Sequence, residues 1–368
     1  MIARPLLATA MVLVATSAFA ADPVGSAPES KRSDDVQGNW LGVWKGKGGM
    51  GGKNVAEICG LGNGEYQATF TAYDSGEQDK GVFTFAINGS SVSDDKVVFT
   101  QRINVGLLGG FSFDADVENG QLLGKYSNGN RYQGTMELKR IEKKPEQVGT
   151  KPLPGAVVLF DGTSLDHWTT VGKTATEWKL AEGVLVAPTL DAPNIGGTGH
   201  LATKAPFGDA QLHVEFRVPY APDKRGQERG QGGLYLWGQY ELQIVDSFGF
   251  ARPKNSANEF ADDDALGAIY KQHAPRELPA LPPGEWQAFD ITLRAAKRDA
   301  NKEVTQPAEV TVFLNGTQIH ERVELTTPTE NAPLADVRSP ARLVLANDGQ
   351  PVEYRSIWYV PLDASTAK

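Results

Sequence analysis

The chain has 368 residues, with 36 lysines and arginines against 45 aspartates and glutamates, 40 glycines and a single cysteine. A chain of this length has room for about two domains, each with a core of its own. The net charge of −9 argues against a nucleic-acid partner, which requires a basic face. One cysteine excludes a disulfide framework and a cysteine-based metal site.

Residues 1–20 have the pattern of a secretory signal peptide. Arg4 supplies the positive start, an apolar run covers residues 6–15, and Ala18-Phe19-Ala20 forms a small-residue cleavage site. The run is too short to span a bilayer, and no other segment is apolar enough for a transmembrane helix. We therefore expect an exported protein, periplasmic or extracellular, with an uncleaved N-terminal anchor as the alternative. Residues 21–35 are predicted to be a flexible lead-in.

Residues 36–142 are predicted to form a small all-β accessory domain. Runs such as Tyr66–Phe70 and Leu122–Tyr126 alternate as half-buried strands do. Turn sequences separate these runs at short intervals: Asn63-Gly64, Asn88-Gly89, Asn119-Gly120 and Asn128-Gly129. The pattern favours a small β-barrel or a sandwich and leaves both open. Its role is equally open between a substrate-gripping or cell-surface attachment module and a simple folding or spacing module.

Residues 143–154 are charged and proline-rich, which predicts a linker. The second domain, residues 155–368, is again strand-rich. Residues 212–218 alternate between apolar and polar, and Asn315-Gly316 lies between two strand-like runs as a hairpin turn does. About 200 residues of antiparallel strands with few helices fit a jelly-roll sandwich. The predicted fold class is therefore all-β throughout the mature chain.

The segment 230–250 carries the strongest indication of chemistry. Glu241 and Gln243 share one face of a predicted strand whose other face is apolar. Strict alternation puts Asp246 on the opposite face, and a single β-bulge after Gln243 would return it to the row. Two carboxylates in one row can act as an acid–base pair. The alternative is that Glu241 and Gln243 simply face solvent.

Residues 247–285 show no periodicity, and long irregular segments inside a compact domain are usually functional or disordered. This segment contains Tyr270, Lys271, His273 and Arg276. We interpret it as a basic, aromatic lid over a polar cleft. The alternative is a solvated insertion, which the acidic run 262–264 favours; that run lacks the spacing of an EF-hand calcium site.

Several stretches of the second domain together resemble a known family. They are Leu159–Gly162, Trp178–Val186, Phe207–Asp209, Glu215–Arg217, Tyr240–Ser247, Gly267–Lys271, Pro282–Trp286, Val310–Val312, Asn315-Gly316 and Ile357-Trp358. On these residues the domain resembles the 3-keto-disaccharide hydrolase family, also described as 3-keto-glucoside 1,2-lyase and hydratase-like domains. The resemblance implies the concanavalin A-like jelly-roll fold of lectins and glucanases. The spacing from Glu241 to Asp246 also resembles the carboxylate row of laminarinase-type glucanases, with Gln243 in place of the central carboxylate.

The resemblance implies a sugar substrate that already carries a ketone at C3. Such a ketone acidifies the C2 proton, so that a base can remove it, the C1 group leaves by β-elimination and water adds to the enone. The implied roles are base or acid for Glu241 or Asp246, and enolate stabilisation or leaving-group protonation for Lys271. The implied substrate-binding residues are Gln243, Trp237, Tyr235, Tyr270, His273 and Gln231. A divalent cation held by Glu241 and Asp246 could replace Lys271, and a separate sugar 3-dehydrogenase would have to make the ketone.

The chain departs from this family in four places, two of which are Leu278, where Asn is usual, and Phe289, where Tyr is usual. Gln231-Gly232-Gly233 stands where Asn-Ser-Gly is common, and Asn347-Asp348-Gly349 stands where Asp-His-Gly is common. The departure at Asn347-Asp348-Gly349 removes a histidine that could serve as acid or base. His200 and His273 are the candidate replacements. A non-catalytic carbohydrate-binding protein on the same sandwich, and a hydrolase of unmodified glucans, are therefore the alternative functions.

Overall fold

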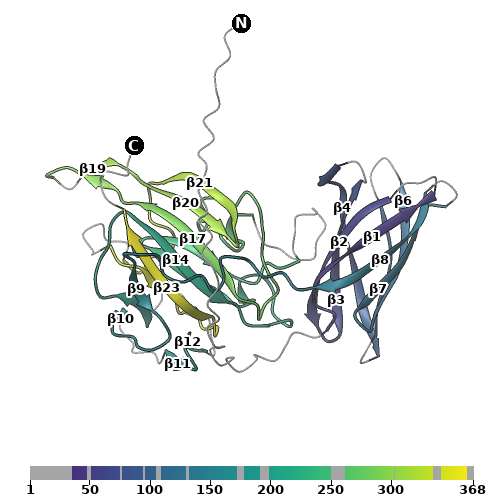
Figure 1. Cartoon of the computed structure of the whole chain (residues 1–368), viewed down its shortest axis with the longest axis horizontal. Coiled ribbons are helices and arrows are strands. Elements are labelled where there is room, and N and C mark those ends of the chain that lie inside the picture. The colour runs from purple at the N-terminus through teal and green to yellow at the C-terminus, as the bar shows by residue number, and fades with distance from the viewer. Residues whose placement is uncertain are drawn as a thin grey trace, which may run out of the picture.

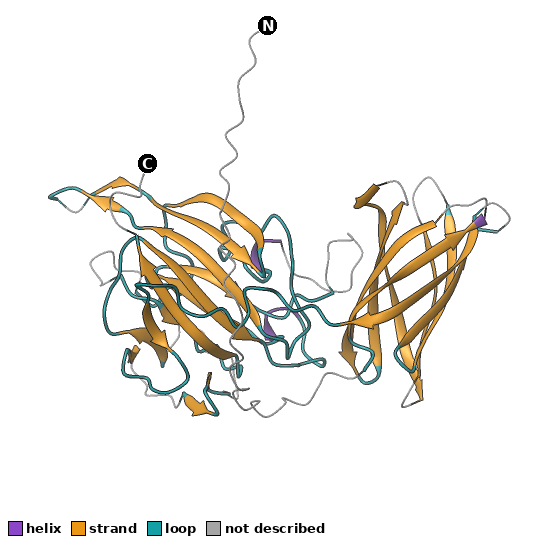
Figure 2. Ribbon diagram, in the orientation of Figure 1, coloured by secondary structure: helices purple, strands orange, loops and turns teal. Residues whose placement is uncertain are grey.

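The structure is a computed structural model that describes residues 35–47, 51–74, 77–93, 96–104, 109–129, 132–171, 178–190, 199–249, 262–301, 303–334 and 341–362. The predicted signal peptide lies outside these residues, as does the lead-in up to residue 34. The described chain consists of strands and loops with very little helix, and it folds as a barrel beside a larger two-sheet body (Figures 1 and 2). No helix among the described residues has the length and apolar character needed to cross a membrane. The predicted all-β class is confirmed.

Eight strands close into the N-terminal barrel in chain order, which decides between the barrel and the sandwich left open by the sequence. They are β1 (Gly38–Gly46), β2 (Gly51–Gly62), β3 (Glu65–Asp74), β4 (Glu77–Ser93), β5 (Lys96–Asn104), β6 (Gly110–Glu118), β7 (Gln121–Ser127) and β8 (Gln133–Ile141). Alternate residues point inward and fill the barrel, as expected for a small barrel. Phe85 is central to this core, with its ring 5.2 Å from that of Phe70 and 4.3 Å from that of Phe113.

Two of the predicted Asn-Gly turns join neighbouring barrel strands. Asn63 and Asn119 have positive φ angles of 52° and 51°, and the glycines that follow them are also positive. The prediction for Asn88-Gly89 is wrong, because both residues lie inside β4. Gly89 serves packing there: a Cβ on Gly89 would lie 2.4 Å from the Phe99 ring.

The C-terminal body is a sandwich of two antiparallel sheets, as predicted. The five-stranded sheet has the order β10 (Trp168–Val171), β13 (His200–Thr203), β22 (Val344–Leu345), β15 (Gly232–Leu236) and β16 (Tyr240–Ile244). The larger sheet has the order β11 (Lys179–Ala181), β12 (Val184–Val186), β23 (Glu353–Pro361), β14 (Ala210–Arg217), β17 (Gln287–Arg294), β20 (Ala308–Leu314) and β21 (Thr317–Leu325), with β9 (Val157–Phe160) paired to β23. A ribbon of β18 (Lys297–Arg298) and β19 (Val304–Gln306) and the 3-10 turns η3 (Gly226–Glu228) and η4 (Asp262–Asp264) complete it.

The five-stranded sheet separates its apolar and polar residues by strand alternation. Leu234, Leu242 and Ile244 belong to the large core shared with the opposite sheet. Their neighbours Tyr235 and Glu241 form a cross-strand pair. Tyr235 packs in a separate cluster on the other face, with Ala202, Val344 and Ala346. This second face, turned away from the sandwich core, carries the candidate site.

The barrel contacts the sandwich through β2 and β3. Arg229 of the sandwich donates a hydrogen bond from Nη1 to the Gly60 carbonyl at 3.2 Å, and the Thr69 hydroxyl donates to the Gly249 carbonyl at 2.8 Å. Cys59, in barrel strand β2, packs into the sandwich core. The two bodies therefore share buried contacts as well as a connecting segment.

Candidate active site

Glu241 is the central carboxyl group of the second face. It lies on β16 and is 4% exposed. The Tyr235 hydroxyl donates to Glu241 Oε2 at 3.0 Å from the neighbouring strand β15. Gly233 provides the room for this carboxyl group, since a Cβ there would lie 2.4 Å from Glu241 Oε1. The pairing of β15 with β16 and the absence of a side chain at Gly233 together fix the position of the Glu241 carboxyl group.

Asp348 supplies a second carboxyl group beside Glu241. It lies in the loop after β22, and its Oδ2 is sealed from solvent without a hydrogen-bond partner. Burial raises the pKa of Asp348 to about 7. Burial and the charge of Asp348 raise the pKa of Glu241 well above its usual range, against the opposing hydrogen bond from Tyr235. Two buried carboxyl groups that repel each other retain a proton near neutral pH.

His200 holds the loop that carries Asp348. The His200 Nδ1 accepts a hydrogen bond of 2.8 Å from the amide of Asn347, the residue before Asp348. Burial lowers the pKa of His200 to about 4, so the ring is neutral at physiological pH. Its ring centroid lies 6.3 Å from that of Tyr235. The predicted candidate His200 therefore lies on the site face and orients the loop beside the carboxyl pair.

The charge of Glu241 also acts on two further tyrosines, Tyr354 and Tyr270. Tyr354, from β23 of the opposite sheet, has a buried hydroxyl group with no hydrogen-bond partner among the described residues. Burial and the charges of Asp348 and Glu241 raise its pKa above the usual range. A Cβ on Gly232 would lie 3.4 Å from this hydroxyl, whereas the next residue, Gly233, faces Glu241. The Tyr354 hydroxyl therefore lies on the core side of the sheet. Tyr270 donates its backbone amide to the Glu241 carbonyl at 3.0 Å, and the charge of Glu241 contributes to raising its pKa after burial.

The predicted row of Glu241, Gln243 and Asp246 is only partly present. Gln243 is buried, donates its side-chain amide to Gln227 and leaves its Oε1 without a partner. The β15–β16 ladder keeps an unbroken register to Ile244, so it contains no bulge before Asp246. Asp246 lies beyond the strand and accepts two hydrogen bonds at Oδ2 from Arg229, at 2.6 and 3.1 Å. Its Oδ1 accepts the Phe248 amide. The structure thus engages both oxygens of Asp246 elsewhere.

Lys271 and the acidic run form one cluster. The Lys271 ammonium donates to Asp264 Oδ2 at 2.6 Å and lies 3.6 Å from Asp263 Oδ1. The hydrogen bond to Asp264 is the first cause that raises the pKa of Lys271. No basic side chain among the described residues forms an ion pair with Glu241 or Asp348. The carboxyl pair is therefore not neutralised by Lys271.

The other predicted binding residues differ from one another in how far they are exposed to solvent. His273 is exposed, and Gln231 is half-buried directly before β15. Trp237 lies in the β15–β16 turn with φ of 52° and is buried in the main core, edge-on to Tyr240. The structure therefore brings Tyr235, Tyr270 and Gln243 to the strands around Glu241, while His273 faces solvent and Trp237 packs in the core.

No group of three or more His, Cys, Asp or Glu side chains suited to a metal ion occurs in the described part of the chain. The cation considered from the sequence needs Glu241 together with Asp246. The oxygens of Asp246 are already used by Arg229 and by the Phe248 amide. The donor set that was predicted for a cation is therefore not assembled.

The sequence interpretation missed Asp348. Asn347-Asp348-Gly349 stood out only as a departure that loses a histidine. The usable signal was the aspartate that stands in place of the histidine, because a carboxyl group with a raised pKa can also exchange protons at neutral pH.

Comparisons with known proteins identify the family of the C-terminal domain. Residues 155–359 match the pattern of the 3-keto-alpha-glucoside-1,2-lyase-like domain. The chain belongs to this family. Membership supports a carbohydrate-active enzyme or carbohydrate binder and leaves the barrel outside the matched region. None of the curated proteins compared with the chain matches it.

Two solved structures from Parabacteroides distasonis, both described as candidate glycosyl hydrolases, are similar to the chain. One is 29% identical with a TM-score of 0.48, over 57% of this chain and 84% of its own. The other is 16% identical with a TM-score of 0.40, over 57% of this chain and 94% of its own.

Proposed function

We propose that this 3-keto-alpha-glucoside-1,2-lyase-like protein cleaves 3-keto-glycosides. A base removes the C2 proton, and the electron pair moves to the ketone oxygen at C3 to give an enolate. The enolate reforms the ketone as the C1–oxygen bond breaks, and the departing oxygen takes a proton from an acid. Water then adds to the enone, so that the net reaction is hydrolysis of the glycoside.

The pair of Glu241 and Asp348 is the observation that carries this proposal. A base and an acid are needed in one site at one pH. Two buried carboxyl groups with raised pKa values supply both when one is ionised and the other is protonated. We assign the base to Glu241, because the Tyr235 hydrogen bond favours its ionised form. Asp348 is then the acid for the leaving group.

Stabilisation of the enolate is assigned to hydroxyl groups. The Tyr270 hydroxyl, on the segment whose backbone amide bonds to the Glu241 carbonyl, can donate to a developing oxyanion. Lys271, to which the sequence interpretation gave this role, is paired with Asp264. Tyr270 is therefore the better candidate for the electrophilic group.

The substrate must come from another protein. Formation of a 3-keto sugar from a glycoside is an oxidation, and we propose a separate sugar 3-dehydrogenase as its source. In keeping with the pattern of residues 1–20, we propose that the reaction takes place after export, in the periplasm or outside the cell.

The proposal is tested with 3-ketotrehalose and a 3-keto-glucoside beside their unoxidised parents. We expect release of product sugar from the keto substrates alone. Glu241→Gln and Asp348→Asn should each lower the rate by at least about a hundredfold, in the range of lost acid–base catalysis. Glu324→Gln, the same change at an exposed position on β21, should leave it unchanged. Binding without turnover would identify a carbohydrate binder, and cleavage of plain glucans would identify an ordinary glucanase; either result would overturn the proposal.

A further inference from the structure

A loop of the sandwich, residues 220–229, lies against the end of barrel strand β2 and is here called the bridging loop. Its Arg225 guanidinium donates to the Leu61 carbonyl at 2.6 Å, and Arg229 donates to the Gly60 carbonyl at 3.2 Å. The approach is close, since a Cβ on Gly62 would lie 2.1 Å from Asp223 Oδ1. The barrel therefore supports the bridging loop through direct hydrogen bonds and tight packing.

The bridging loop also holds the strand that carries Glu241. Its Arg229 forms the buried ion pair with Asp246, directly beyond β16. Its Gln227 accepts a hydrogen bond at Oε1 from Gln243 Nε2, within β16 itself. One loop thus connects the barrel to the strand of the candidate base.

The Asp264 carbonyl determines how the two amide side chains are oriented. A backbone carbonyl is an acceptor, so the group of Gln227 that meets it at 2.8 Å is the amide nitrogen. The Gln227 oxygen is then turned toward Gln243 and accepts a hydrogen bond from its Nε2. Gln243 Oε1 is left buried, with no partner among the described residues. The amide nitrogen of Gln243 is therefore directed to Gln227.

Gln243 is a close neighbour of the Glu241 carboxyl group. Gly233 is the cross-strand partner of Gln243, and a Cβ on Gly233 would lie 2.4 Å from Glu241 Oε1. The Cβ atoms of such partners are about 4.5–5.5 Å apart and point to the same face. The Gln243 side chain therefore starts beside the space that the carboxyl group fills, and its orientation decides whether Glu241 has an amide donor beside it.

We propose that the barrel positions the bridging loop, and that Gln227 is a positioning residue that keeps the Gln243 amide nitrogen from bonding to Glu241. A donor at Glu241 would stabilise the carboxylate and weaken it as a base. By holding that nitrogen, Gln227 preserves a carboxyl group with a high affinity for a proton. The catalytic consequence rests on the proposed function, whereas the orientation of the amides does not.

The titratable groups that face Glu241 come from other elements. Tyr235 of β15 donates to it, Asp348 of the loop after β22 raises its pKa, and Tyr270 lies opposite it on the segment that runs along β16. Three further charged residues act on Tyr270: Lys271, Asp264 and Glu330. Because Gln227 is uncharged, its replacement alters hydrogen bonds and leaves this set of charges unchanged.

Carboxyl NMR of the full-length protein, made with isotope-labelled glutamate, tests the proposal without a substrate. The Glu241 resonance is assigned by its absence in Glu241→Gln, and its titration midpoint is followed against pH. Gln227→Met keeps the length of the side chain but removes the amide, so the Gln243 nitrogen becomes free to turn to Glu241. We expect the midpoint to fall by at least about half a pH unit. An unchanged or higher midpoint would overturn the proposal.

A double variant separates this effect from the entry of water. In a Gln243→Met background, Gln227→Met should leave the midpoint unchanged, because no amide remains to reach Glu241. A fall as large as that in the unmodified background would show that solvation is the cause, and would contradict the role given to Gln227.

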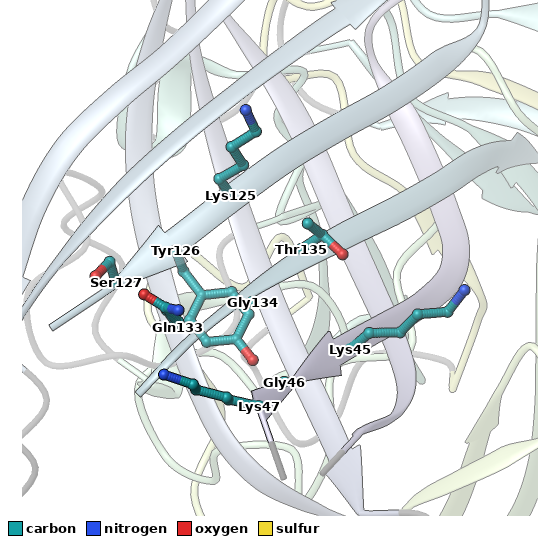
Figure 3. A pocket seen from close by; sticks show the side chains of 9 residues that line it. All are labelled: Lys45, Gly46, Lys47, Lys125, Tyr126, Ser127, Gln133, Gly134 and Thr135. Atoms are coloured by element: carbon teal, nitrogen blue, oxygen red, sulfur yellow. The ribbon is translucent and has the colours of Figure 1, made fainter. Parts of the chain in front are cut away.

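Variants within the barrel test its part in the arrangement. Gly62→Ala places a methyl group 2.1 Å from Asp223 Oδ1 and should lower the Glu241 midpoint by a smaller amount. Gly120→Ala is the matched control, because Gly120 has a similarly positive φ, 69° against 82°, and open space around a Cβ. Lys125→Met, at the barrel rim where β1 ends (Figure 3), is a control away from the bridging loop. Equal midpoints in the two glycine variants would overturn the role of the barrel.

The rate profile gives a separate readout. With a keto substrate, the acidic limb of Gln227→Met should move to lower pH, because a base with a lower pKa is ionised at lower pH. Loss of the Tyr235 hydrogen bond should move the limb in the opposite direction. If the keto substrates are not turned over, the proposed function fails, and the NMR midpoints still decide the role of Gln227.

Discussion

Tyr235 and Glu241 are joined by a hydrogen bond across two paired strands, from the Tyr235 hydroxyl to Glu241 Oε2 at 3.0 Å. The bond favours the ionised carboxylate and opposes the effects of burial and of Asp348 on its pKa. The pair thus sets how readily Glu241 serves as a base.

Tyr235→Phe should shift the pH dependence of the reaction. Loss of the hydrogen bond raises the pKa of Glu241 further, so the acidic limb of the rate profile should move to higher pH. Tyr359→Phe, which removes a hydroxyl from a half-buried ring stacked on Phe207, is the matched control. A uniform loss of rate with an unchanged profile would show that Tyr235 does not act through the Glu241 pKa.

Gly233→Ala should impair turnover by displacing Glu241. The added methyl group would lie 2.4 Å from Glu241 Oε1, closer than nonbonded atoms approach, so the carboxyl group must move. We expect a fall in kcat of at least about tenfold, because small misplacements of a reacting group are costly. Gly208→Ala, where a Cβ meets nothing within 4 Å, should retain full activity. Equal rates for the two variants would contradict the assigned position of Glu241.

Asp348→Asn should change how stability depends on pH. The Asp348 pKa is raised by burial to about 7, so the folded state holds the proton more tightly than the unfolded state does. The stability that this proton contributes is fully present below the unfolded pKa of about 4. It declines by ~1.4 kcal/mol per pH unit as the pH rises from there to the folded pKa. The asparagine variant should lack most of this decline. Urea unfolding of both proteins at about pH 4.5 and about pH 8 measures it, and parallel stabilities would contradict the prediction.

Arg229→Met should destabilise the whole chain. The substitution leaves the Asp246 carboxylate buried without its ion-pair partner and removes the hydrogen bond to the barrel at Gly60. Removing one partner of a buried ion pair typically costs about 3–5 kcal/mol. Arg322→Met breaks an exposed pair with Glu309 and should leave the denaturation midpoint nearly unchanged. Comparable midpoints for the two variants would show that the Arg229–Asp246 pair is not a structural anchor.

Local periodicity explains what the sequence predicted well. Alternation along β16 assigned Glu241 and Gln243 to one face, and Asn63 and Asn119 marked turns, because both properties depend on neighbouring residues only. The turn predicted at Asn88-Gly89 is absent, because the glycine is needed for close packing against Phe99. Contacts between residues far apart in the sequence likewise determine which groups surround Glu241.

The surroundings of Asp246 and Asp348 could not be predicted from their spacing in the sequence. Asp246 is close to Glu241 in sequence, yet the preceding segment places Arg229 against it. Asp348 is far along the chain, and only the register of β15 with β22 brings its loop to Glu241. The family resemblance located the right loop but suggested a loss of function there, because a histidine was expected and a carboxyl group was found.

The central claim is that Glu241 and Asp348 together remove and return protons on a 3-keto sugar. The most direct measurement is exchange of the C2 hydrogen of a 3-keto-glucoside into heavy water, followed by NMR. The account predicts rapid exchange by the unmodified protein and by Glu324→Gln, with a loss of at least about a hundredfold in Glu241→Gln. Exchange at an undiminished rate in Glu241→Gln would contradict it.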